Sequence, residues 1–194
     1  VISQENGKLV IDRRSRDQEI SMGEDGWTIF VYLCGSDLES DAGAASDDIE
    51  EALAAYPSQQ IRVVYQTGGS SYWYQDISDD RLERFVLENG ELQKVDERPN
   101  ANMGDAGTLS EFLIWGVQHY PAERMGVILW DHGSGSINGV CFDEQYEYDS
   151  LSVAEMAAAF DRVYDSMTDR FEFIGFDACL MSTLEVANQM VPYA

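Results

Sequence analysis

Four short runs of apolar, β-branched and aromatic residues divide this chain, and turn-forming or polar residues follow each run. The runs are Trp27–Cys34, Ile61–Thr67, Gly126–Asp131 and Phe171–Phe176. A run that is apolar at nearly every position is typical of a strand buried on both faces of a parallel sheet. The pattern therefore predicts four buried strands.

Helical patterns lie between these runs. The apolar spacing predicts helices over Ser46 to Tyr56, Thr108 or Ser110 to His119, Ser152 to Asp165, and Met181 to Met190. Pro57, Pro121 and Pro192 fit the ends of three of them, because proline cannot continue a helix. Ser152 and Glu155 have the spacing of a capping box. Strands that alternate with helices predict a three-layer α/β domain with a mostly parallel sheet.

Residues 72–95 depart from this pattern. Apolar and polar residues alternate there, and Asn89-Gly90 separates the last two alternating stretches, which is a strong hairpin signal. We predict antiparallel β-structure added to the parallel core. Residues 1–26 are charge-rich and weakly patterned, so we divide the chain into an N-terminal arm (1–26) and a single domain (27–194). The arm reads as a flexible terminus or a propeptide-like lead.

The charge balance narrows the possible partners. The chain has 194 residues, of which 36 are acidic and 12 basic, giving a formal net charge of -24. Nucleic acids and anionic membranes need clustered Lys and Arg, so both are excluded as expected partners. No apolar run approaches the roughly 18 residues of a membrane span. Three cysteines make an odd number, so no disulfide framework is expected.

Residues with reactive side chains gather at the predicted carboxyl ends of the strands. His132, one of two histidines, follows the third strand, and Cys179 follows the fourth. Cys34 ends the first strand and has the same claim as Cys179, although a strand-end cysteine is also often a small buried hydrophobe. Chemistry collects at this edge of open α/β sheets. An imidazole there can raise the thiolate fraction and protonate a leaving amine, so we predict a Cys–His nucleophilic pair.

Residues beside this pair fit acyl transfer. Cys179 precedes the helix predicted from Met181, whose dipole would favour the thiolate. The backbone N–H groups of Gly133 and Cys179 are reasonable oxyanion donors, since glycine lets the backbone come close. Asp177 stands two residues before Cys179, so in an extended chain the two side chains project to the same side. A carboxylate in that place could form the floor of a pocket for a basic side chain.

Other candidates have structural explanations. Asp131 precedes His132 but points the opposite way on strand geometry, so it is a weaker candidate for orienting that histidine. Cys141 looks structural. His119 stands at a predicted helix end, where we expect it to interact with the helix C-terminus.

No residue pattern predicts a metal site. Asp37-x-Glu39-x-Asp41 superficially resembles a calcium loop, but Ala42 stands where an EF-hand needs glycine and the twelfth position is not glutamate. We interpret this segment as a solvated acidic loop. The acidic segment 143–149 has the carboxylates to bind a cation, but we interpret it as a surface loop. The cysteines and histidines lack the spacing of a zinc site.

Two segments together resemble the clostripain family of cysteine peptidases, whose wider relatives with the caspase-like fold include gingipains and legumains. Residues 131–135 (DHGSG) follow one buried strand, and residues 176–182 (FDACLMS) follow the next. Residues 31–39 (VYLCGSDLE) are also similar to the first strand and loop of that family. The resemblance covers the chain from about Trp27 to its C-terminus.

The resemblance implies a caspase-like fold and a Cys–His dyad of Cys179 and His132, with no obligatory third member. It also implies cleavage after Arg or Lys, with acid in the S1 pocket supplied by Asp177. Family members are often precursors, cut internally into a light and a heavy chain and exported by bacteria, and some need calcium. We therefore expect peptide or protein substrates with a basic P1 residue, autoprocessing, and a heavy chain from the same precursor as a partner. The expected location is secreted, cell-surface or periplasmic, and calcium is the one cofactor that the family suggests.

Two features depart from the family pattern. The chain ends at Ala194, soon after the nucleophile, whereas family catalytic domains continue with strands and helices that complete the sheet and the substrate pocket. We therefore expect the chain to cover the first part of the fold. The segment between Cys141 and Ser152, near where relatives are cut, contains no Lys or Arg, so self-cleavage there is not expected.

Three functional hypotheses follow. The leading one is a cysteine endopeptidase that uses His132 and Cys179, with Asp177 favouring a basic P1 residue. The second is a non-catalytic caspase-like module that binds a partner or peptide through the same cleft. The third is a small-molecule hydrolase or transferase that uses Cys34 or Cys179 and does not require a basic side chain.

Overall fold

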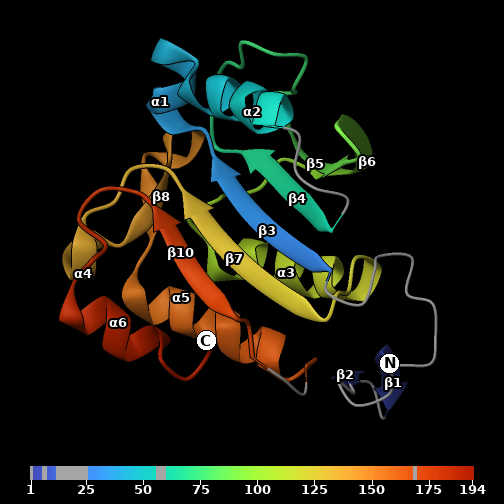
Figure 1. Ribbon diagram of the computed structural model, residues 1–194. Coiled ribbons are helices and arrows are strands. Elements are labelled where there is room, and N and C mark those ends of the chain that lie inside the picture. Colours follow the sequence, from blue (N-terminus) through green and yellow to red (C-terminus); the bar gives the residue numbers. More distant parts are fainter. Residues whose placement is uncertain (1, 6–7, 12–25, 56–59, 168–169) are drawn as a thin grey trace.

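The computed structural model describes residues 2–5, 8–11, 26–55, 60–167 and 170–194. Its centre is a six-stranded sheet of order β10-β7-β3-β4-β5-β6. Four strands run parallel, and their arrowheads point to one end of the molecule in Figure 1: β3 (Trp27–Cys34), β4 (Ile61–Gly68), β7 (Arg124–Trp130) and β10 (Phe173–Asp177). The prediction of four parallel strands is confirmed, with small shifts at their ends. The prediction that all four are buried was wrong for β10, which lies at the edge of the sheet and is only partly buried.

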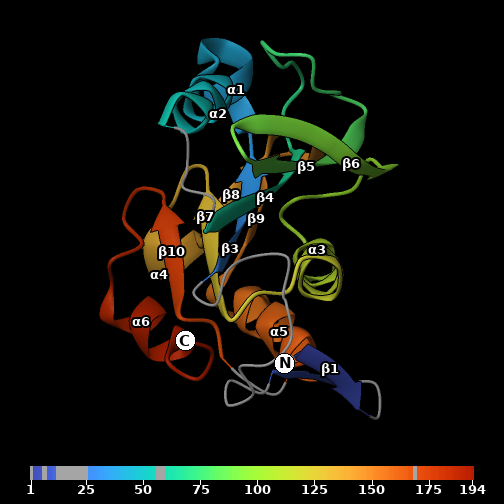
Figure 2. The ribbon, with the colours of Figure 1, turned by 45° about the vertical axis from the view of Figure 1, so that its right-hand side comes forward.

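The remaining two strands of this sheet form the predicted hairpin. β5 (Arg81–Glu88) pairs antiparallel with β4 and with β6 (Glu91–Pro99). Asn89 and Gly90 form the turn, and both have positive φ, as Asn-Gly favours. Figures 1 and 2 show the hairpin at the opposite side of the sheet from β10. The prediction was wrong at its start, because residues 72–74 lie in a loop that buries Trp73.

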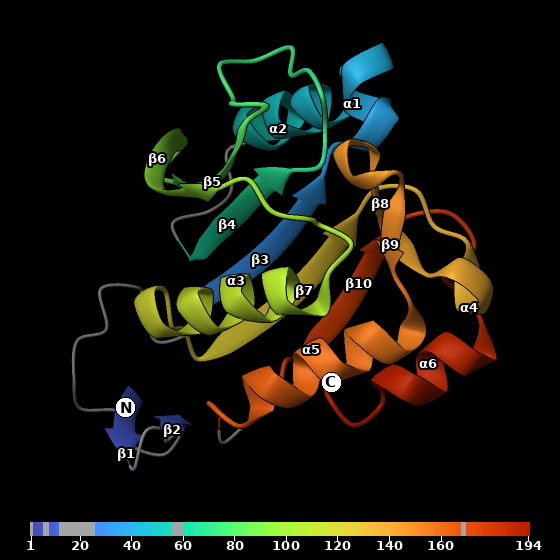
Figure 3. The same ribbon diagram turned by 180° about the vertical axis from the view of Figure 1, so that it is seen from behind.

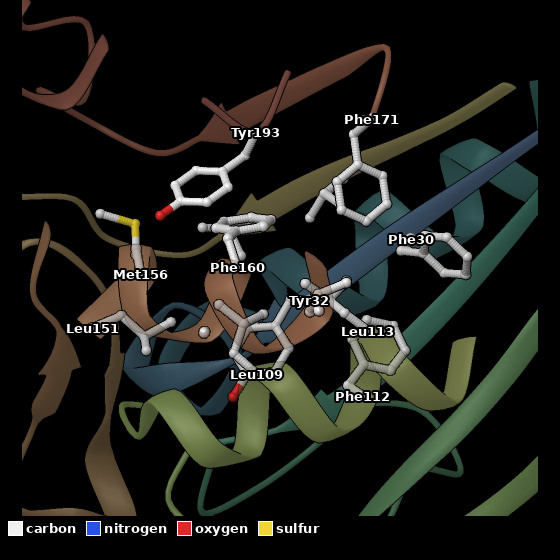
Figure 4. Packing of buried hydrophobic residues seen from close by; sticks show 14 of the residues in the cluster. Phe30, Tyr32, Leu109, Phe112, Leu113, Leu151, Met156, Phe160, Phe171 and Tyr193 are labelled. Carbon is white, nitrogen blue, oxygen red and sulfur yellow. The ribbon is translucent and has the colours of Figure 1, made fainter. Parts of the chain in front are cut away.

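Three helices cover one face of the sheet: α3 (Ala106–His119), α5 (Val153–Tyr164) and α6 (Leu184–Met190). Figure 3 shows α3 and α5 lying across this face, and Figure 4 shows the aromatic packing beneath them. The rings of Phe30 and Tyr32 on β3 contact Phe112 on α3. A Cβ at Gly116 would lie 2.6 Å from the Phe30 ring, so glycine lets α3 approach the strand closely.

The opposite face is covered by α2 (Ala44–Ala55). Val31 and Leu33 of β3 point to this side, because successive residues of a strand face opposite ways, and they pack in the same cluster as Ile49 of α2. The indole N–H of Trp130 donates to Asp48 on the same helix, with a nitrogen–oxygen distance of 2.6 Å. The predicted three-layer α/β domain is confirmed.

Short elements crowd the carboxyl end of the parallel strands. They are α1 (Ser36–Ala42), α4 (Gly135–Asn138), β8 (Val140–Asp143), the 3-10 helix η1 (Glu144–Tyr146) and β9 (Asp149–Leu151). β8 pairs antiparallel with β9 as a separate ribbon. The predicted catalytic residues lie among these connections.

The helix starts test the capping predictions. Ser152 and Glu155 form the predicted capping box at the start of α5. The prediction for α3 was wrong, because Asp105 caps it by accepting from the backbone N–H groups of Gly107 and Thr108. An aspartate in extended conformation before a helix satisfies N–H groups that otherwise lack a partner.

Part of the predicted N-terminal arm is described. β1 (Ile2–Glu5) pairs antiparallel with β2 (Lys8–Ile11). Residues 12–25 of the arm, and the predicted helix end at Tyr56 and Pro57, lie outside the described residues. In the described part of the chain, no helix combines the length and apolar character that a membrane crossing requires.

Candidate active site

His132 and Cys179 follow two strands that lie side by side. β7 and β10 are hydrogen-bonded in parallel, and the last pair in register is Trp130 opposite Asp177. His132 and Cys179 each stand two residues beyond that pair. The sheet therefore delivers the two residues to neighbouring positions at its carboxyl edge, as the sequence predicts.

The loops that carry these residues are in close contact. A Cβ built on Gly133 would lie 2.1 Å from the carbonyl oxygen of Cys179 and 3.1 Å from Cβ of Ala178. Gly135, with φ of 64°, lies against the carbonyl oxygen of Leu180, which a Cβ would meet at 3.0 Å. Real Cβ atoms do not approach a carbonyl oxygen to 2.1 Å, so position 133 requires glycine. This close approach joins the histidine loop to the cysteine loop.

His132 has a carboxylate partner. Its Nε2 lies 2.7 Å from Oδ1 of Asp37, and the two side chains are 42% and 39% exposed. Asp37 stands in the first turn of α1, which follows β3 directly, and β3 is the strand on the other side of β7. The nitrogen that remains available to another partner is Nδ1.

The segment around Asp37 corrects a prediction. We expected a solvated acidic loop over Asp37, Glu39 and Asp41, but residues 36–42 form α1 and Glu39 is fully buried. The Glu39 carboxylate accepts hydrogen bonds from the backbone N–H and hydroxyl of Ser46 and from the backbone N–H of Tyr74. Its three donors come from two other segments, so it fixes α1 instead of binding solvent. The sequence could have indicated Asp37 as a site residue, because it follows a strand end at the same sheet edge as His132.

Cys179 is the exposed thiol of the chain. Cys34 and Cys141 are fully buried, and no cysteine is in a disulfide. The predicted stabilisation of the Cys179 thiolate by a helix dipole was wrong, because α6 begins at Leu184 and is capped by Thr183. A non-helical turn separates the nucleophile candidate from α6.

The two buried cysteines do not share this environment. Burial raises the pKa of both the Cys34 and the Cys141 thiols well above the usual value. A buried, protonated thiol is a poor nucleophile. The prediction that Cys34 is as good a candidate nucleophile as Cys179 was therefore wrong. Cys141 is structural, as expected: its Sγ lies 3.9 Å from the carbonyl oxygen of Trp130, and its backbone has a φ of 62°.

Asp131 precedes His132 and makes hydrogen bonds with backbone groups of the neighbouring strands. Its carboxylate accepts a hydrogen bond from the backbone N–H of Phe142 in β8, and its own N–H donates to the carbonyl of Asp177 across to β10. The Cys141 N–H donates to the carbonyl of His132 in the same region. Burial raises the pKa of Asp131 to about 7. Asp131 thus ties β7, β8 and β10 together, and Asp37 is the carboxylate bonded to the histidine ring.

The remaining candidates are readily placed. Asp177 is the last residue of β10 and is exposed. Nδ1 of His119 lies 2.8 Å from the carbonyl oxygen of Trp115, near the end of α3, which confirms the expected helix-end contact. Within residues 26–55, 60–167 and 170–194, no group of three or more acidic, cysteine or histidine side chains is arranged to hold a metal ion.

Comparison with known proteins assigns the family. The family model described as the clostripain family matches residues 31–194. The chain belongs to the clostripain family. Clostripain from Hathewaya histolytica is 26% identical over 196 residues, covering 84% of this chain and 35% of that protein. The family resemblance seen in the sequence is therefore confirmed.

Solved structures confirm the fold of this clostripain-family chain. A secreted C11 cysteine protease from Bacteroides thetaiotaomicron, in complex with an irreversible peptide inhibitor, matches with a TM-score of 0.66 and 19% identity, covering 87% of this chain and 47% of that one. An inactive zymogen C11 protease from Parabacteroides distasonis matches with a TM-score of 0.61 and 22% identity, covering 87% and 46%. The chain spans less than half the length of these relatives.

Proposed function

We propose that this clostripain-family chain carries the catalytic dyad of a cysteine endopeptidase, with Cys179 as nucleophile and His132 as general base and acid. The observation that carries the proposal is the placement of both residues two positions beyond one register pair of β7 and β10. Cys179 is also exposed, unlike the other two cysteines. Membership of the clostripain family supports this chemistry for the pair.

The proposed reaction has two halves. The Cys179 thiol gives its proton to the His132 ring, and the sulfur attacks the peptide carbonyl to form a tetrahedral intermediate. The imidazolium then protonates the leaving amine, and an acyl-enzyme remains. His132 next takes a proton from water, which attacks the thioester, and the proton returns to sulfur as the acid product leaves.

Backbone N–H groups of Gly133 and Cys179 are proposed to hold the oxyanion. Both belong to the loops that meet at position 133, where a Cβ built on Gly133 would lie only 2.1 Å from the carbonyl oxygen of Cys179. Two fixed N–H donors stabilise the negative charge that develops on the carbonyl oxygen, and removing one such donor typically costs roughly 100-fold or more in rate.

Preference for Arg or Lys at P1 is assigned to Asp177. This carboxylate ends β10, is exposed to solvent and stands two residues before Cys179. A planar guanidinium can bind a carboxylate through two parallel hydrogen bonds, so arginine would be favoured over lysine. The strongly acidic chain also attracts cationic substrates.

A partner segment is proposed for the open edge of the sheet. Among the described strands, β10 pairs only with β7. Ile137, Leu180 and Leu184, around the same end of β10, are 85%, 73% and 82% exposed. Such apolar side chains fit a covered surface, and the relatives extend well beyond the length matched here. We assign this edge to a heavy chain from the same precursor.

We also propose that the protein is secreted, because one structural relative is described as a secreted protease.

The test is hydrolysis of peptidyl-arginine and peptidyl-lysine amide reporters by the full protein. We expect cleavage of both, slower cleavage of a neutral P1 reporter, and loss of activity in Cys179→Ala and His132→Ala. Asp177→Asn should narrow the difference between basic and neutral reporters, whereas Asp79→Asn, an exposed charge-matched control, should not. Normal turnover by Cys179→Ala would refute the dyad. A reporter that is never cleaved, together with an unlabelled Cys179, would favour the binding-module alternative.

A further inference from the structure

We propose that Asp37 is a positioning residue for His132, and that its carboxylate holds the imidazole with the proton on Nε2 and with Nδ1 free for the Cys179 thiol. The proposal rests on the proposed function and adds a third member to the pair. Its basis is the 2.7 Å contact between Nε2 of His132 and Oδ1 of Asp37. An ionised carboxylate can only accept hydrogen bonds, so the ring nitrogen that it contacts must be the donor.

The tautomer decides whether His132 can act as a base. In a neutral imidazole, one nitrogen carries the proton and the other carries the lone pair. With Nε2–H donated to Asp37, the lone pair is on Nδ1, and only that nitrogen can take a proton from sulfur. Without Asp37, both tautomers would be populated and the ring could rotate. Part of the population would then be unable to accept the thiol proton.

The sheet order supports this assignment. β10, β7 and β3 are consecutive in the sheet, and the residues that follow them are Cys179, His132 and Asp37. The histidine strand therefore lies between the cysteine strand and the aspartate strand. This order places the base between the nucleophile and the carboxylate that orients it.

The backbone before Asp37 is shaped to place it. Ser36 is fully buried and has a φ of 51°, in the left-handed region that costs a residue with a side chain about 1 kcal/mol or more. Its N–H donates to the carbonyl of Gly69, and its carbonyl accepts from the hydroxyl of Ser70. These bonds hold a turn that directs the chain out of β3 into α1.

The helix that carries Asp37 is fixed from the other side by Glu39. This buried carboxylate accepts three hydrogen bonds, two from Ser46 and one from Tyr74. Asp37 is thus held on a short helix anchored at both its start and its middle. A rigidly held carboxylate can define one orientation of the imidazole, which a mobile surface aspartate could not do.

The test compares Asp37→Ala and Asp37→Asn in the full protein, with Asp41→Ala as a control of equal charge on the same helix. Turnover of a peptidyl-arginine amide gives kcat and KM, and nitrogen-15 NMR of the histidine ring gives the tautomer. The His132 signals are identified by their loss in His132→Ala. Unfolding curves establish that each variant is folded.

We expect Asp37→Ala to lower kcat by roughly tenfold to a hundredfold with little change in KM, the scale of a lost hydrogen bond to a charged group. Its ring should show a mixture of tautomers. The Asp37→Asn amide can accept from Nε2–H through its oxygen or donate through its NH2 to an unprotonated Nε2, so this variant should also show a mixture of tautomers and a lowered kcat. Asp41→Ala should match the unaltered protein in both readouts.

The outcomes separate this inference from the proposed function. If Cys179→Ala and His132→Ala abolish turnover while Asp37→Ala leaves kcat or the tautomer unchanged, the role of Asp37 is refuted and the dyad stands. If Cys179→Ala retains turnover, the proposed function fails first. The NMR readout needs no turnover, so an unchanged tautomer in Asp37→Ala refutes the inference even in an inactive precursor.

Discussion

Replacement of Asp131 by asparagine tests the electrostatics beneath the site. The aspartate is buried at the end of β7, and burial raises its pKa from 3.8 to about 7. The native protein therefore keeps this proton up to about pH 7, whereas the unfolded chain releases it near pH 3.8. The stability that Asp131 contributes is complete below pH 3.8 and is lost as the pH rises through 7.

The magnitude follows from the size of the shift. A rise from 3.8 to about 7 is about three pH units, and each unit is worth about 1.4 kcal/mol, so ionising buried Asp131 costs up to about 4 kcal/mol at pH 8. Asparagine has no such titration and retains an oxygen to accept from the Phe142 N–H. Asp131→Asn should therefore gain free energy of unfolding relative to the unaltered protein as the pH rises from 4.5 to 8.

Equilibrium urea unfolding at several pH values measures this difference. We expect the gap between variant and unaltered protein to change by about 2 to 4 kcal/mol across that range. Asp79→Asn, at an exposed position, serves as the charge-matched control, and the Asp131→Asn gap is compared with its gap at each pH. A constant gap for Asp131→Asn would show that this carboxyl titrates normally in the folded protein and would refute the reasoning.

Three further predictions concern packing and reactivity. Gly133→Ala forces a Cβ onto the Cys179 carbonyl and should lower kcat/KM roughly 100-fold, whereas Gly175→Ala in β10 meets its nearest neighbour at an ordinary 3.5 Å and should change kcat/KM little. Arg84→Lys should lower the free energy of unfolding by about 2 to 4 kcal/mol in urea, because a buried guanidinium bonded to a glutamine and two carboxylates loses its planar fork. Iodoacetamide should modify Cys179 alone in the native protein and all three cysteines in urea, by intact mass; native modification of a buried cysteine would contradict the burial described.

The sequence predicted those parts of the fold that depend on local pattern. The run Trp27–Cys34 is apolar throughout and became β3 with the same bounds. Asn89-Gly90 specified its hairpin because few other dipeptides accept two positive φ angles. The capping box of Ser152 and Glu155 was equally local. Features that depend on three or four neighbouring residues were therefore accessible before the structure.

Features that depend on distant partners were not accessible in this way. Glu39 was assigned to solvent because an acidic residue among acidic neighbours is usually exposed, and its partners Ser46 and Tyr74 come from other segments. Cys34 and Cys179 had equal claims on sequence, since both follow buried strands, and only burial separated them. The Asp37 contact with His132 joins residues 95 positions apart, so it required the strand order.

The most direct test of the dyad is covalent labelling of the full protein with a peptidyl-arginine chloromethyl ketone, followed by peptide mapping. A Cys179 nucleophile assisted by His132 predicts one adduct, located on Cys179, and much slower labelling in His132→Ala. An adduct on any other residue, or an undiminished labelling rate in His132→Ala, would contradict the account.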